Sequence, residues 1–169
     1  MFSLLIEKQQ LNYLRRKISM LSDFISPNLI RLQIHVKNWR EAVQASGDLL
    51  VDAGICEARY VEAMIAAVER LGPYMVLAPG IALAHARPED GMLKAGLSIV
   101  TLAEPVEFGS VDNDPVCLII GFGGVDKHGH IQMLQDLAIF LSEESNQIFL
   151  KEADDVSSLM AAFQNGVGG

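Results

Sequence analysis

The feature that most restricts the fold is a nearly continuous apolar segment from Val116 to Phe122. A strand that is apolar at almost every position must be covered on both faces of its sheet, whereas an alternating strand needs cover on one face only. Gly96–Leu102 is also rich in residues that favour strands and is predicted to be a second, central strand. A chain with such strands has to supply helices for both sides of a sheet.

Helical spacing of apolar residues recurs between and after the predicted strands. Asn38 is a suitable N-cap for the first of these helices, and Gly72-Pro73 ends the second. Helices are expected at Trp39–Ala53, Glu57–Leu71, Ile131–Leu141, Ser142–Leu150 and Val156–Phe163, the last one capped by Asp154 or Asp155. This interleaving of helices and strands predicts an α/β fold in which one sheet carries helices on both faces.

Four shorter segments complete the predicted sheet. Leu29–Val36 alternates apolar and polar residues, which is typical of a strand with one buried face. The alternation places His35 on the polar face, so His35 is predicted to be an exposed residue with no special role. Tyr74–Leu77 and Ile81–Ala84 are predicted to be extended, and Val106–Phe108 is a candidate edge strand.

Length and charge limit the number of domains and the kinds of partner. A chain of 169 residues, half of them hydrophobic, is expected to form one domain with a sizeable core. The net charge of −8 argues against binding to nucleic acid or to an anionic membrane, and it suits basic protein partners. Cys56 and Cys117 show no disulfide framework, which fits a reducing cytosol. No segment approaches the roughly 20 apolar residues of a membrane span, so direct insertion into a membrane is not expected.

Residues 1–22 differ from the rest of the chain. The basic residues at 15–17 follow a short apolar stretch, the reverse of the order in a secretory signal, so a signal peptide is not expected. A basic amphipathic helix is one alternative for this segment, and a loose extension outside the core is the structure that we expect. The predicted folded domain covers residues 23–164.

Two segments combine a strand end, glycines and histidine, namely Gly80–His85 and Gly123–His130. Ligands of open α/β sheets bind beyond the carboxyl ends of strands, so both segments are candidates for one shared site. Histidine has an unperturbed pKa of about 6.5, so a largely neutral His85 is a suitable nucleophile for a phosphoryl group. The second segment also opens a helix, whose free N–H groups favour an anion. No Walker-type phosphate loop is present, and no nucleotide or other cofactor is expected.

The residues alone leave two alternatives to phosphoryl or acid–base chemistry. His85, Asp126, His128 and His130 offer nitrogen and oxygen ligands in a number that suits a metal ion. Against a metal site, the chain has no H-E-x-x-H motif. The second alternative is that these histidines lie in loops and have no chemical role. Their spacing does not decide among the three.

Several short motifs, taken in order, carry a resemblance to a known family. They are Gly72-Pro73-Tyr74, Ala78-Pro79-Gly80-Ile81-Ala82-Leu83-Ala84-His85, Arg87-Pro88-Glu89-Asp90-Gly91, Asp112-Asn113-Asp114-Pro115-Val116 and the segment from Val125-Asp126 to His130. In these motifs the chain resembles the enzyme IIA components of the bacterial phosphoenolpyruvate-dependent sugar phosphotransferase system, of the mannitol/fructose class. Within that class it is most similar to the ascorbate-type proteins. The resemblance extends from about Ile30 to Met160.

The resemblance implies a fold, a reaction and partners. It implies a single domain with a mixed sheet between helix layers. It implies that His85 is phosphorylated by the carrier protein HPr, and that the phosphoryl group passes to a cysteine of a IIB component and then to a sugar entering through the membrane component IIC. It also implies that His130 is a second active-site histidine, with His128 as the fallback. It further implies that no cofactor or metal takes part in this reaction, that the protein is cytoplasmic, and that the transported sugar is L-ascorbate or a related compound.

Two positions depart from the family pattern. Ala84 stands where the family usually has proline before the active histidine, and the change removes a restraint on φ. The helix that ends Ala66-Ala67-Val68-Glu69-Arg70 has no clear counterpart of an arginine that the mannitol and fructose branch tends to carry. The first departure keeps a second function open, that of a regulatory interaction module with weak phosphoryl transfer.

Overall fold

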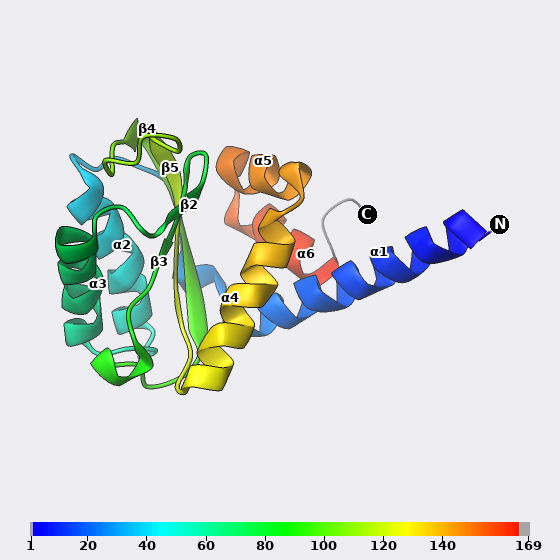
Figure 1. Ribbon diagram of the computed structural model, residues 1–169, viewed down its shortest axis with the longest axis horizontal. Coiled ribbons are helices and arrows are strands. Elements are labelled where there is room, and N and C mark those ends of the chain that lie inside the picture. The colour runs from blue at the N-terminus through cyan, green and yellow to red at the C-terminus, as the bar shows by residue number, and fades with distance from the viewer. Residues whose placement is uncertain (1, 166–169) are drawn as a thin grey trace.

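The computed structural model describes residues 2–165, in which helices and strands alternate along the chain (Figure 1). The helices are α1 (Phe2–Leu21), α2 (Trp39–Asp52), α3 (Ala58–Leu71), α4 (Lys127–Leu141), α5 (Glu144–Glu152) and α6 (Val156–Asn165). The strands are β1 (Ile30–Ile34), β2 (Val76–Ala78), β3 (Ile81–Ala84), β4 (Gly96–Val106) and β5 (Val116–Gly123). A short 3-10 helix, η3 (Pro88–Asp90), follows β3.

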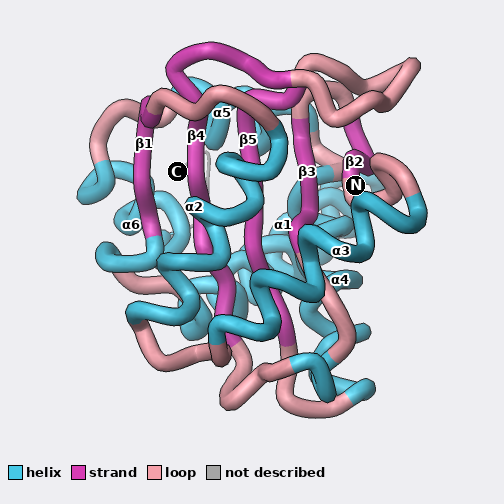
Figure 2. Tube along the Cα trace, turned by 90° about the vertical axis from the view of Figure 1, so that its left-hand side faces the viewer, coloured by secondary structure: helices cyan, strands magenta, loops and turns pink. Residues whose placement is uncertain are grey.

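The five strands form one mixed sheet in the order β1-β4-β5-β3-β2, which Figure 2 shows from the side covered by α2 and α3. The pairs β1–β4 and β3–β5 are parallel, and the pairs β4–β5 and β2–β3 are antiparallel. Helices α2 and α3 cover one face, and α4, α5 and α6 lie on the other together with the end of α1 (Figure 1). The predicted α/β fold, a mixed sheet between two helix layers, is confirmed.

The core lies on both sides of the two central strands. Every residue of β5 except Cys117 is buried, and so are the first seven residues of β4. The strand predicted from the unbroken apolar run is therefore confirmed, together with its cover on both faces. At the edge, Arg31 and Gln33 of β1 are exposed and the other residues of the strand are at least partly buried, and His35 just beyond the strand is exposed as predicted.

The predicted edge strand at Val106–Phe108 is wrong. β4 continues to Val106, which pairs with Val116 of β5. The register of β4 against β5 shifts between Thr101 and Val106, and Pro105 lies in this irregular part. Proline has no N–H to donate to a sheet, and it is tolerated where regular pairing is interrupted.

The fourth helix begins earlier than the apolar spacing predicts. α4 starts at Lys127, because Asp126 caps it and accepts a hydrogen bond from the N–H of Gly129 at 2.7 Å. His128 and His130 therefore lie in the first turn of a helix and not in a loop. This position fixes the direction in which the ring of His130 leaves the backbone.

The expectation of a loose N-terminal extension is also wrong, since residues 2–21 form helix α1. α1 lies against α4 and α6, and its first half projects away from the domain (Figure 1). The side chains of Leu4, Leu5, Ile6 and Leu11 are each more than half exposed. Among residues 2–165, no helix is long and apolar enough to cross a membrane. A domain boundary between residues 22 and 23 stays a prediction.

Candidate active site

His85 is the first residue after β3, at the point where this strand leaves its parallel pairing with β5. Its ring nitrogen Nδ1 lies 2.7 Å from the carbonyl oxygen of Leu83. A carbonyl can only accept a hydrogen bond, so Nδ1 carries the proton when the ring is neutral. The lone pair of a neutral His85 is therefore on Nε2.

Three rings surround the imidazole of His85. Tyr74 meets it edge-on, with ring centroids 5.4 Å apart, and Phe122 lies at 5.2 Å. The centroid of the His130 ring is 5.7 Å from that of His85, and His130 also stacks on Phe122 at 5.4 Å. Phe122 thus supports both histidines from the end of β5.

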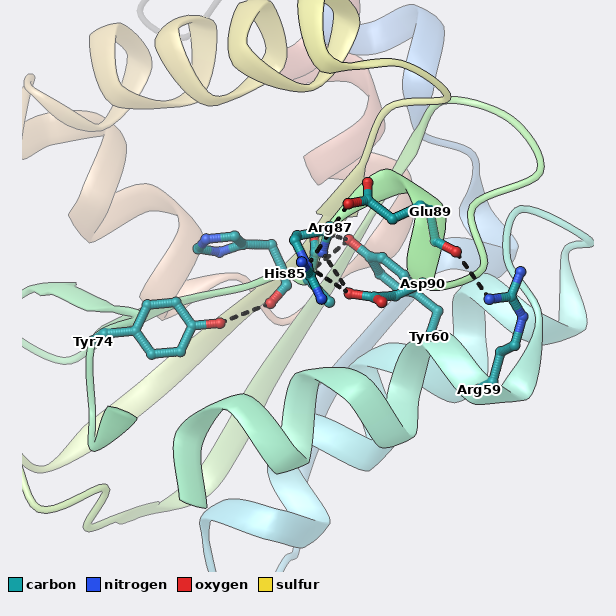
Figure 3. A network of polar contacts seen from close by, with 8 residues as sticks. Arg59, Tyr60, Tyr74, His85, Arg87, Glu89 and Asp90 are labelled. Atoms are coloured by element: carbon teal, nitrogen blue, oxygen red, sulfur yellow. Dashed lines mark hydrogen bonds and ion pairs between the residues drawn. The ribbon is translucent and has the colours of Figure 1, made fainter. Parts of the chain in front are cut away.

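Two tyrosine hydroxyls hold the backbone that follows His85 (Figure 3). The hydroxyl of Tyr74 donates to the carbonyl oxygen of His85 at 2.9 Å. The hydroxyl of Tyr60, from α3, accepts from the N–H of Ala86 at 3.0 Å and donates to the carbonyl of Phe122 at 2.8 Å. These contacts tie the segment after β3 to the end of β5. They restrain the backbone next to Ala84, where the family pattern has proline.

The loop after His85 is closed by further polar contacts. Asp90 accepts from the N–H of Arg87 at 3.1 Å, and Arg59 of α3 donates to the carbonyl of Glu89 at 2.9 Å (Figure 3). The guanidinium of Arg87 lies 3.5 Å from the carboxylate of Asp90 and 3.8 Å from that of Glu89. The loop is therefore a fixed wall of the site.

His130 reaches the site because the chain between β5 and α4 is very tight. A Cβ atom at Gly124 would lie only 2.5 Å from the backbone nitrogen of His130 and 2.7 Å from the carbonyl carbon of Gly129. Only glycine allows this approach, which brings the first turn of α4 against the strand end. The Nδ1 atom of His130 is buried and has no hydrogen-bond partner among the described residues.

The environment of both rings favours their neutral form. Burial lowers the pKa of His85 below its usual value, and the hydrogen bond to Leu83 opposes this only in part. Burial also lowers the pKa of His130, the positive charge of a protonated His85 lowers it further, and Glu89 opposes both. Neutral imidazole is the nucleophilic form of histidine.

A cavity of about 760 Å³ opens over the two rings. Its walls come from α3, the segment 85–90 and the first turn of α4. The wall consists of cationic side chains, carboxylates and an apolar part. The charged lining residues are Arg70, Arg87, Glu89, Asp90 and Lys127, and Leu71 and Ile131 belong to the apolar part. The cavity can admit a phosphoryl group together with the surface of a second protein.

The structure brings together two of the histidines named from the sequence and separates the third. His85 and His130 face the same cavity, whereas His128 is exposed and does not line it. The metal-site alternative is not supported by the side-chain positions. Within residues 2–165, no group of three or more His, Cys, Asp and Glu side chains is placed to hold a metal ion, so His85, Asp126, His128 and His130 do not form one. Sequence reasoning missed Tyr60, which gave no signal, and the role of Tyr74, although Tyr74 belongs to the motif Gly72-Pro73-Tyr74.

Known proteins match this chain over most of its length. The family model described as "Phosphoenolpyruvate-dependent sugar phosphotransferase system, EIIA 2" matches residues 23–166. The ascorbate-specific PTS system EIIA component of Escherichia coli (strain K12) is 46% identical over 118 residues, which are 69% of this chain and 77% of that protein. The protein of the same name from Salmonella choleraesuis is 44% identical over 120 residues, or 70% of this chain and 78% of that protein.

Solved structures agree with these relatives. The mannitol-specific cryptic phosphotransferase enzyme IIA from Escherichia coli superposes with a TM-score of 0.77 at 34% identity, over 86% of this chain and 99% of that chain. The mannitol enzyme IIA of Escherichia coli in complex with phosphorylated enzyme IIB superposes with a TM-score of 0.71 at 29% identity, over 82% of this chain and 96% of that chain.

Proposed function

Because the chain belongs to the EIIA type 2 family of the phosphoenolpyruvate-dependent sugar phosphotransferase system, we propose that it is a cytoplasmic phosphoryl carrier that uses His85. It receives the phosphoryl group from a histidine of HPr. It passes the group to a cysteine of a IIB component, which serves the membrane component IIC. His85 is the phosphorylated residue, and His130 is the second active-site histidine.

The observation that carries this proposal is the hydrogen bond from Nδ1 of His85 to the carbonyl of Leu83, at 2.7 Å. It leaves the lone pair on Nε2, in a ring whose lowered pKa keeps it neutral. The ring also lines the cavity, where a donor can approach. A nucleophile with a fixed tautomer needs no proton transfer before it attacks.

In each of the two transfer steps one bond to phosphorus forms and one breaks, so no further reactant is needed. Nε2 of His85 attacks phosphorus, a P–N bond forms there, and the P–N bond to the donor histidine breaks, so that the donor ring recovers its lone pair. In the second step a thiolate of IIB attacks phosphorus. The P–S bond forms, the bond to Nε2 breaks, and His85 returns to the neutral ring. The proton stays on Nδ1, hydrogen-bonded to the Leu83 carbonyl, throughout both steps.

His130 is suited to contact the phosphoryl oxygens. Its Nδ1 atom is buried without an acceptor, so a neutral ring is more stable with its proton on Nε2. The Nε2–H group can then donate a hydrogen bond to an oxygen of the phosphoryl group on the neighbouring ring, 5.7 Å away between centroids. Phosphoryl transfer depends chiefly on such positioning and charge stabilisation.

The partner and the sugar are proposed from the relatives. A related mannitol enzyme IIA is known in complex with phosphorylated enzyme IIB, which supports a IIB partner for this chain. Relatives at 44–46% identity are ascorbate-specific EIIA components, so we assign the chain to uptake of L-ascorbate or a related compound. The hydrogen bonds of Tyr60 and Tyr74 restrain the backbone beside Ala84, and no described contact favours the regulatory alternative over transfer.

The test is intact mass spectrometry after incubation with phosphoenolpyruvate, enzyme I and HPr. The protein should gain one phosphoryl group, and His85→Ala should gain none. His130→Ala should remain folded and accept the group about 10- to 100-fold more slowly, as expected for the loss of a hydrogen-bond donor to developing charge. His128→Ala is the matched control and should behave as the native protein. A full phosphoryl gain in His85→Ala would refute the assignment.

A further inference from the structure

The cavity over His85 is lined by more cationic side chains than form ion pairs there. Three cationic side chains line it, from Arg70, Arg87 and Lys127. The charge of Arg87 is matched by the carboxylates of Asp90 and Glu89. The side chains of Arg70 and Lys127, by contrast, form no ion pair or hydrogen bond with any residue in the described part of the chain.

Arg70 lies close to the unit that holds His85. It is in the last turn of α3, and it lines the same cavity as Tyr74 and His85. Burial raises the pKa of Tyr74, and the positive charge of Arg70 opposes this shift. The hydroxyl of Tyr74 in turn bonds to the carbonyl of His85 at 2.9 Å. The guanidinium therefore lines the same cavity as the nucleophile and forms no ion pair within residues 2–165.

Lys127 occupies a position that does not benefit its own helix. It is the first residue of α4, where the helix dipole already places partial positive charge. A cation at this end is unfavourable for the helix, and an acidic residue would stabilise it. The cost is removed when an anion binds between the helix N-terminus and the lysine.

We propose that Arg70 and Lys127 form a cation pair that binds the oxygens of the phosphoryl group on His85. α3 and α4 cover opposite faces of the sheet (Figure 1), so the two cations that line the cavity come from both helix layers. Before transfer the rings of His85 and His130 carry no net charge, and after it the proton kept on Nδ1 gives the His85 ring one positive charge, whereas the phosphoryl group carries nearly two negative charges at neutral pH. The pair supplies the missing charge through hydrogen bonds that are stronger than neutral ones.

This inference rests on the proposed function, in which His85 carries the phosphoryl group, and it is tested without a partner protein. The small donor phosphoramidate phosphorylates reactive histidines directly, so effects on docking are absent. Arg70→Gln and Lys127→Gln should each slow phosphorylation of His85 by about tenfold, the size of one charge-assisted hydrogen bond. The ³¹P titration of the phosphorylated protein should show a raised second pKa of the phosphoryl group, because the lost cation had favoured the dianion.

Matched controls separate a local effect from the loss of net charge. Arg31→Gln on β1, at the opposite edge of the sheet, and Lys37→Gln remove the same charges from exposed positions outside the cavity. Both should behave as the native protein, and Arg70→Lys should recover part of the rate. Equal rates in the native protein and both cavity variants would overturn the cation pair. A loss of the same size in the two controls would also overturn it.

A second measurement distinguishes failure of the cation pair from failure of the proposed function. Inorganic phosphate is titrated into the unmodified protein, and the ring resonances of His85 and His130 are followed by NMR. Phosphate should shift both resonances, with affinity at least about fivefold weaker in Arg70→Gln and Lys127→Gln, consistent with the loss of a charged contact. If His85 accepts no phosphoryl group but phosphate binding still depends on both cations, the carrier function fails and the cation pair stands. If phosphate binds equally to all variants, the pair is refuted.

Discussion

One hydrogen bond at His85 determines which of its two nitrogens is available for chemistry. The carbonyl of Leu83, two residues earlier, holds the proton on Nδ1 and leaves Nε2 toward the cavity. Burial among Tyr74, Phe122 and His130 then disfavours the charged ring. Backbone geometry and packing together therefore orient the ring of His85 and favour its neutral form.

The first prediction concerns the pH dependence of this nucleophile. The pKa of His85 lies below its unperturbed 6.5, so the neutral ring persists to lower pH than in a free histidine. The rate of phosphorylation by phosphoramidate, corrected for donor ionisation, should stay constant from about pH 8 down to 6.5 and fall only below that. An NMR titration of the ring resonance, identified by its loss in His85→Ala, gives the midpoint directly. A midpoint above 6.5 would contradict the prediction.

The same shift makes stability depend on pH in one direction. The unfolded chain binds a proton at His85 near pH 6.5, whereas the folded protein binds it only at lower pH. The contribution of the neutral buried ring to stability is complete above 6.5 and is lost as the pH falls through the folded-state pKa.

The second prediction compares the two tyrosines that hold the loop. Tyr60 is fully buried, and Tyr60→Phe would leave the N–H of Ala86 and the carbonyl of Phe122 without their partner. We expect it to lower the free energy of unfolding by about 1–3 kcal/mol. Tyr74 is only partly buried and makes one such bond, so Tyr74→Phe should cost less than about 1 kcal/mol. Urea unfolding measures both, and an equal loss in the two variants would show that the Tyr60 contacts contribute little.

Residues of the site differ in how far the sequence reveals them. His85 and His130 could be singled out because each ends a glycine-containing segment beside a predicted strand. Tyr60 could not, because its hydroxyl contacts the backbone of Ala86 and Phe122. These partners are 26 and 62 positions away in the sequence, and no local pattern indicates the contacts. Arg70 could not either, because its place at the cavity depends on how α3 lies across the sheet.

At the scale of secondary structure, the start of α4 controls the second histidine. The apolar spacing predicts a helix from Ile131, but it does not detect a first turn whose residues are polar. Asp126 is the residue that marks the start of this helix. Aspartate is a preferred N-cap, and its side chain accepts a hydrogen bond from the N–H of Gly129, three residues later. With the helix starting at Lys127, His130 lies on a rigid element and not in a flexible loop.

The third prediction tests how closely this helix must approach β5. Gly124→Ala places a Cβ atom 2.5 Å from the backbone nitrogen of His130, so the first turn of α4 has to move. We expect a loss of about 1–3 kcal/mol in stability and slower phosphorylation, because overpacking displaces His130. Gly129→Ala is the matched control in the same turn, where the new Cβ meets only the Asp126 carboxylate at 3.4 Å. Alanine is the better helix former, so this variant should be about 1 kcal/mol more stable. Normal stability and rate in Gly124→Ala would contradict the account of the tight connection.

The first helix shows where sequence patterns fail at this scale. The basic residues at 15–17 follow a short apolar stretch, and a loose extension is the structure expected from the sequence, with a basic amphipathic helix as the alternative. In the structure the segment is helical and lies against α4 and α6. Tertiary contacts therefore stabilise a helix that the sequence pattern does not predict. The central strands were predictable for the opposite reason, because complete burial leaves an unbroken apolar run.

Across the whole molecule, the site lies beyond the end of β3, where one helix from each layer lines the cavity. α3 covers one face of the sheet and α4 the other, and both contribute to the cavity wall (Figure 1). The net charge of −8 does not describe this region. Of the nine Lys and Arg residues that follow residue 21, three line the cavity, against two carboxylates. The acidic balance therefore belongs mainly to surfaces away from the site, and an apolar contact is the better candidate for docking.

The last prediction concerns that contact. Ile131 lines the cavity and is 43% exposed, and Ile148 on α5 is 46% exposed but lies outside it. The two side chains are matched in type and exposure, and both are on helices. Ile131→Ala should weaken the complex with the proposed IIB partner by about fivefold or more, the effect of losing about 1 kcal/mol at a buried interface position. Ile148→Ala should leave the affinity unchanged. Isothermal titration calorimetry gives both constants, and thermal unfolding checks that neither variant is destabilised. If both substitutions weaken the complex equally, or neither does, the partner does not bind over the cavity that α3 and α4 both line.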